Sequence, residues 1–115
     1  MSYDLRIGVQ VADTYVIAKI AQPEYASPTY NLRDMFVACM DWDYKQGQWY
    51  RCDKVIDRIE KGILELKIHR DNYIQYNPSN GWGNVNSALR ALESLRSCIY
   101  EQAEDIPIQY LWMAW

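Results

Sequence analysis

Residues 5–11 read LRIGVQV, in which apolar side chains alternate with polar residues or glycine. A period of two is typical of a β-strand with one buried face. Residues 15–21 are apolar and β-branched, and they follow an interruption at Asp13 and Thr14. The sequence therefore predicts a β-hairpin at the start of the chain.

Two helices are expected after a proline-containing loop at residues 22–30. Asn31 is the expected N-cap of the first helix, with Asp34 in the capping-box position. Asp53 is the expected N-cap of the second helix, and Gly62 in its middle leaves room for close packing. The apolar stripes that predict them are Leu32, Met35, Phe36, Cys39 and Met40, and then Ile56, Ile59, Ile63 and Leu66. Between them, residues 41–51 show no sustained period and predict an aromatic loop.

A third helix and a last strand are expected in the C-terminal part of the chain. The helix follows the loop NPSNGWG at residues 77–83, with Asn84 or Asn86 as its N-cap. Its apolar stripe is Ala88, Leu92, Leu95 and Ile99. Residues 106–115 are short, apolar and aromatic, and they predict a third strand.

The expected fold class is therefore α+β, in the order β-β-α-α-α-β. A hairpin alone is marginally stable, so the last strand is expected to join it in a small antiparallel sheet of about three strands, packed against the helices. Pairing of the last strand with another copy of the chain is the alternative. At 115 residues the chain is expected to form a single domain, residues 1–115.

The amino-acid composition of the chain limits the class of protein to which it can belong. Apolar runs fall far short of the ~20 residues that span a bilayer, and the start lacks a secretion pattern, so we expect a cytoplasmic protein with no membrane partner. A net charge of −3 disfavours non-specific nucleic-acid binding. Cys39, Cys52 and Cys98 match no disulfide framework or zinc pattern, and buried, reduced thiols are expected.

The aromatic content is the main indication of binding. The chain has ten Tyr and five Trp but one Phe. Rings with a polar tip suit surfaces that are half buried and half wet, and they concentrate at interfaces and ligand sites. The alternative is that these rings form the rim of the core.

Two aromatic loops are the candidate ligand site. The rings of residues 42–50 offer flat apolar walls, and the glycines of residues 80–83 let backbone N–H groups approach a ligand closely. Arginine side chains nearby would pair with an anionic group. The alternative is that Trp82 fills the core and the glycines only form the turn. The candidate ligand-binding residues are Tyr30, Arg33, Trp42, Tyr44, Trp49, Arg51, Asn80, Gly81, Trp82 and Gly83.

No catalytic motif is found in the sequence. His69 is the only histidine, and no nucleophile elbow, phosphate-binding glycine loop or zinc-protease motif is present. Asp41 and Asp43 would offer two carboxylates to Mg²⁺ or Ca²⁺, but such a site needs a further ligand. We therefore predict no catalytic residue, no metal and no cofactor, and expect a binding protein rather than an enzyme.

Several segments together resemble an uncharacterised family of small proteins carried by bacteriophages and integrative elements of gut bacteria. They are PEYASPTYNL at residues 23–32, DWDY at 41–44, NGWG at 80–83 with Ser87, Ala88 and Leu89, and IPI at 106–108 with Trp115. The resemblance covers nearly the whole chain. It implies a mobile-element context inside a bacterial host cell and no particular activity.

Three functions are consistent with the sequence. The first is an oligomeric anti-defence protein that sequesters a small anionic ligand, such as a nucleotide-type immune signal. The second is a protein–protein inhibitor of a host defence factor, CRISPR effectors included, which would use exposed Tyr and Trp as hot spots on a flat patch. The third is a small metal-dependent phosphodiesterase that uses Asp41 and Asp43.

Overall fold

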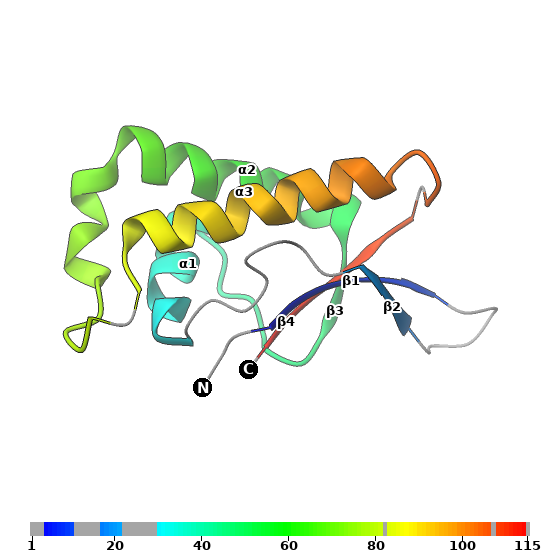
Figure 1. Ribbon diagram of the computed structural model, residues 1–115, viewed down its shortest axis with the longest axis horizontal. Helices are drawn as coiled ribbons and strands as arrows, with labels where there is room; N and C mark the ends of the chain where they lie inside the picture. The colour runs from blue at the N-terminus through cyan, green and yellow to red at the C-terminus, as the bar shows by residue number, and fades with distance from the viewer. Residues whose placement is uncertain (1–3, 11–16, 22–29, 82, 107, 115) are drawn as a thin grey trace.

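The computed structural model describes residues 4–10, 17–21, 30–81, 83–106 and 108–114. Within them the chain forms a four-stranded sheet and three α-helices (Figure 1). The elements are β1 (Asp4–Gln10), β2 (Ile17–Ala21), η1 (Tyr30–Leu32), α1 (Arg33–Met40), β3 (Trp49–Arg51), α2 (Cys52–Ile68), η2 (Arg70–Asn72), η3 (Ile74–Tyr76), α3 (Val85–Gln102) and β4 (Tyr110–Ala114). The expected α+β class and the order of the main elements are confirmed.

The sheet has the strand order β2-β1-β4-β3, and every neighbouring pair is antiparallel. The N-terminal hairpin and the pairing of the last strand with it are therefore confirmed. The alternative, in which the last strand pairs with another copy of the chain, is wrong, because β1 and β3 occupy both edges of β4. The strand also begins at Tyr110, four residues later than its expected start at Ile106.

Strand β3 lies inside the segment that was expected to be a loop. It is only three residues long, which is too short for a period to be visible in the sequence. Its register places Trp49 opposite Trp112 and Arg51 opposite Tyr110. These pairings form only when the last strand is in place, so tertiary structure decides this strand.

The sheet and the helices form two layers, with α2 and α3 along one face of the sheet and α1 beneath them beside one end of the sheet (Figure 1). Alternate residues of β1 and β4 point into the core between the layers and are buried. This core includes Leu5, Ile7, Met35, Phe36, Ile59, Leu66, Leu92, Leu95, Leu111 and Met113. None of the helices among the described residues is long and apolar enough to cross a membrane.

Two of the expected helix caps are wrong. Helix α1 continues from the 3-10 turn η1, so Asn31 lies inside that turn and the N-cap, Leu32, makes no side-chain bond. Helix α2 begins at Cys52, one residue before Asp53, and its N-cap is Arg51, which makes no side-chain cap bond. The backbone N–H of Cys52 donates to the carbonyl of Gln109 at 2.8 Å. Strand β3 ends at Arg51, so α2 follows it with no loop between them, and this bond links the first residue of the helix to the residue before β4.

The expected cap of the third helix is confirmed at Asn84. Its side-chain Oδ1 accepts a hydrogen bond from the backbone N–H of Ser87 at 3.0 Å. The backbone of Asn84 is extended, as an N-cap requires.

At Gly62 the helix α2 packs closely against both α1 and α3. A Cβ atom at this position would lie 2.7 Å from Cγ of Met40, 3.0 Å from Cδ1 of Leu92 and 3.3 Å from Sγ of Cys39. All three neighbours are fully buried, so they have little room to move. The expected close packing is therefore confirmed, and it joins α1 and α3 through α2.

We predict that Gly62→Ala destabilises the protein by about 1 kcal/mol. Overpacking a core costs roughly 1–3 kcal/mol, which exceeds the gain of up to ~1 kcal/mol in helix propensity. The measurement is the free energy of unfolding in urea. Ser97→Ala, at an exposed position of α3, is the control and should not destabilise. A Gly62→Ala protein more stable than wild type would contradict the packing.

The three cysteines are free and buried, as expected. Burial raises the pKa of the Cys39 and Cys52 thiols from 9.0 to about 12, because a thiolate loses its hydration in the core. The folded-state pKa is above the unfolded-state value, so this contribution to stability is complete below pH 9 and is lost as the pH rises toward 12.

We predict that a disulfide reagent modifies Cys39 and Cys52 slowly at pH 9 in the folded protein, although a solvated thiol of pKa 9.0 is half ionised there. In denaturant all three cysteines should react at once. Absorbance gives the rate, and peptide mass spectrometry identifies the site. Fast modification of both thiols in the folded protein would contradict the burial of these two side chains.

Candidate binding face on the sheet

The face of the sheet that points away from the helices carries large aromatic and basic side chains. In β4, buried Leu111 and Met113 alternate with half-buried Tyr110 and Trp112. Because the side chains of a strand alternate between its two faces, Tyr110 and Trp112 point away from the core. The same alternation brings Arg6, Trp49 and Arg51 to this side. We define the open face by five residues, which are Arg6, Trp49, Arg51, Tyr110 and Trp112.

The strand register orders the open face in rows. Trp112 lies directly opposite Trp49 on one side and Arg6 on the other. The centroids of the Trp49 and Trp112 rings are 5.3 Å apart, with an interplanar angle of 49°. In the next row, Arg51 lies opposite Tyr110. Two indoles and a phenol therefore form a continuous strip across β3 and β4.

Both guanidinium groups of the open face already have a carboxylate partner. Arg6 Nη2 donates to Asp4 Oδ2 at 3.0 Å. Arg51 Nε and Nη2 donate to the two carboxylate oxygens of Asp53 at 3.1 and 2.7 Å. The hydrogen bond from Arg51 also lowers the pKa of the Asp53 carboxyl, so that both partners stay charged near neutral pH. The charges of these four residues therefore sum to zero.

Other predicted site residues pack into the body of the protein. Tyr44 is buried, and the ring of Trp42 lies 5.3 Å from that of Tyr44 and 4.9 Å from that of Tyr50. The guanidinium of Arg33 lies 5.3 Å from the centre of the Tyr44 ring, and its Nη2 donates to the Tyr44 carbonyl at 3.0 Å. These contacts hold the chain between α1 and β3 in place, so Arg33, Trp42 and Tyr44 support the structure here.

The glycine turn lies elsewhere in the molecule. Asn80 and Gly81 are exposed in the turn between η3 and α3, at the end of the helical layer away from β3 (Figure 1). Gly83 follows in the same connection, and Trp82 lies outside the described residues. Tyr30 begins η1, and its side chain is also outside the described part. The predicted residues whose side chains the structure describes therefore do not gather at one place, and of these Trp49 and Arg51 belong to the open face.

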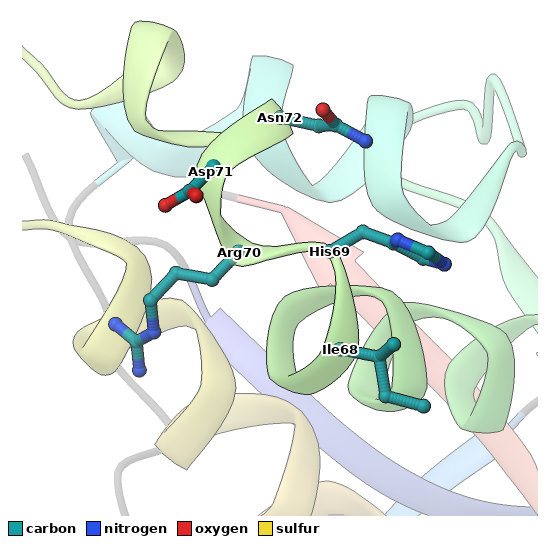
Figure 2. A pocket seen from close by; sticks show the side chains of 5 residues that line it. All are labelled: Ile68, His69, Arg70, Asp71 and Asn72. Atoms are coloured by element: carbon teal, nitrogen blue, oxygen red, sulfur yellow. The ribbon is translucent and has the colours of Figure 1, made fainter.

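A cavity of about 260 Å³ lies at the C-terminal end of α2, lined by Ile68, His69, Arg70, Asp71 and Asn72 (Figure 2). Figure 2 shows these side chains pointing apart, with Arg70 and Asp71 on one side and His69 on the other. Arg70 is held by a hydrogen bond to Asn86 on α3. The groups do not converge on one point, as a specific site for a small ligand would require.

The two carboxylates of the metal hypothesis have basic partners. Asp41 Oδ2 lies 3.9 Å from Arg58 Nη1, and Asp43 Oδ1 lies 3.5 Å from Arg33 Nη2. Among the described residues, no three His, Cys, Asp or Glu side chains gather as a metal site would need. The further ligand that a metal-dependent phosphodiesterase requires is not found in this part of the chain.

No family model, curated protein or solved structure matches this chain, so the site is interpreted from its own geometry. Sequence reasoning missed Arg6, Tyr110 and Trp112 as site residues. The pattern YLWM at residues 110–113 has the period of a half-buried strand and would have placed both rings on one face.

We predict that Tyr44→Ala destabilises the protein by roughly 3 kcal/mol or more, because it empties a fully buried aromatic position. Arg51→Ala, which removes an exposed ion pair, should leave the urea midpoint almost unchanged. Urea unfolding followed by circular dichroism measures both. A large loss of stability in Arg51→Ala with none in Tyr44→Ala would reverse the assignment of these two residues.

Proposed function

We propose that this protein is a non-enzymatic binding protein and that a partner protein docks on its open face. The observation that carries the proposal is the neutral aromatic strip formed by Trp49, Trp112 and Tyr110 with Arg6 and Arg51 beside it. Trp, Tyr and Arg are the residues that dominate binding energy at protein interfaces. A sheet surface presents them on a rigid support, which lowers the entropy lost on binding.

The charge pairing favours a protein over a nucleotide as the partner. A phosphate would have to draw Arg6 away from Asp4 and Arg51 away from Asp53, and the Arg51 pair has two hydrogen bonds, of 3.1 and 2.7 Å. Both ion pairs are accessible to solvent, so this exchange itself costs little, but the carboxylates of Asp4 and Asp53 would then lie beside the phosphate and repel it. A protein surface needs no such exchange, because it can pack on the rings and leave both ion pairs at the rim.

Sequestration of a nucleotide-type signal is the second candidate. The observation in its favour is the row of rings on β3 and β4, because bases stack on aromatic side chains exposed on a sheet. The anti-defence role and a host defence factor as the target follow from the resemblance to phage proteins alone. They stay predictions.

The proposal is tested with wild type, Arg6→Glu and Lys67→Glu. Lys67 forms an exposed 3.3 Å ion pair with Glu93 across the helical layer, so Lys67→Glu makes the same change in charge on the other side of the molecule. Each protein is immobilised and exposed to a lysate of the bacterial host. Any retained protein is then purified and titrated against all three, and nucleotides are titrated calorimetrically in parallel.

We expect one host protein to bind wild type and Lys67→Glu with equal affinity and to bind Arg6→Glu at least tenfold more weakly, since a hot spot of ~2 kcal/mol corresponds to more than a factor of ten. If the host protein binds Arg6→Glu as tightly as wild type, the open face is not its docking site. If a nucleotide gives heat in the calorimetric titration and no host protein is retained, the second candidate function replaces the proposal.

A further inference from the structure

We infer that the open face also binds a second copy of this chain, packed sheet to sheet about a two-fold axis that runs parallel to β4. The inference rests on the proposed function, because it uses the same face, and it names one protein that this face binds. Two observations carry it, namely the pairing of the charges beside the rings and the order of the rows.

The charge balance suits a surface that packs against itself. A face-to-face dimer brings two identical patches together, so any net charge on the patch would repel its own copy. Here Arg6 is paired with Asp4 at 3.0 Å and Arg51 with Asp53 at 2.7 Å. The charges of these four residues cancel within each copy, so neither ion pair adds net charge beside the rings.

The order of residues in the rows is self-complementary. A two-fold axis along β4 places β3 of one copy over β1 of the other and leaves each row opposite itself. In the row Trp49–Trp112–Arg6, each Trp49 then faces Arg6 of the second copy, and Trp112 meets its own counterpart near the axis. Trp is the strongest cation–π acceptor among the side chains, so the dimer gains this contact twice.

The next row runs Arg51–Tyr110–Gly8, and Gly8 pairs with Lys19 of β2 at the edge of the sheet. Each Arg51 therefore lies over the buried backbone of Gly8 in the second copy, so no side chain of β1 opposes it. Sheets that pack face to face lie about 10 Å apart with their strands within about 30° of each other, which keeps the rows in correspondence near β4. Helices α2 and α3 lie on the other face of the sheet, away from the contact (Figure 1).

Sedimentation velocity of the purified chain, from micromolar to millimolar concentration, tests the inference. Five proteins are compared, which are wild type, Arg6→Glu, Trp49→Arg, the double variant Arg6→Trp with Trp49→Arg, and the control Lys67→Glu. Circular dichroism first establishes that each is folded. The double variant exchanges the two facing groups, so it restores the contact across the axis that Trp49→Arg breaks.

We expect wild type and Lys67→Glu to dimerise with the same dissociation constant. Arg6→Glu and Trp49→Arg should raise it at least tenfold, and the double variant should recover most of that loss. Such recovery requires the two positions to meet between copies and does not follow from general destabilisation. A wild type that is monomeric throughout, a dimer insensitive to Arg6→Glu, or a double variant no better than Trp49→Arg overturns the inference. The proposed function is judged separately by the lysate experiment, because a monomer can still bind a host protein.

Discussion

The pairing of β4 with β1 on one edge and β3 on the other is the contact on which the rest of the structure depends. It brings the end of the chain into the middle of the sheet, where both backbone edges are satisfied. It also buries Leu111 and Met113 against the helices. Just before the strand, Gln109 is buried, and its side-chain Nε2 donates to the carbonyl of Ile99 at 2.8 Å. This bond ties the last strand to α3.

The same pairing creates the open face. Because β4 alternates strictly, the insertion that buries two of its side chains must turn Tyr110 and Trp112 to the other side. The short strand β3 then adds Trp49, and β1 adds Arg6, from distant parts of the sequence. The binding surface and the core are thus two consequences of one register, and a shift by one residue would exchange them.

Three of the residues predicted from the sequence as ligand contacts make contacts within the body of the protein. Trp42, Tyr44 and Arg33 fix the long connection between α1 and β3 by ring contacts and a hydrogen bond to the backbone. The amino-acid composition of the chain cannot distinguish a Tyr that packs in this way from a Tyr that faces a ligand. The excess of Tyr and Trp over Phe therefore indicated amphipathic positions correctly and could not say which of them face outward.

The sequence by itself determined the features that depend on local patterns. These are the strand β1, most of the buried stripes of the helices, the Asn84 cap, the close packing at Gly62 and the free, buried state of the thiols. Each follows from the spacing of side chains along one element or from the chemistry of one residue. Tertiary structure alone decided that β3 is a strand and that Arg6, Trp49 and Trp112 share a row. Those features depend on hydrogen bonds between segments far apart in the chain, and no local periodicity encodes which distant strand will be the neighbour.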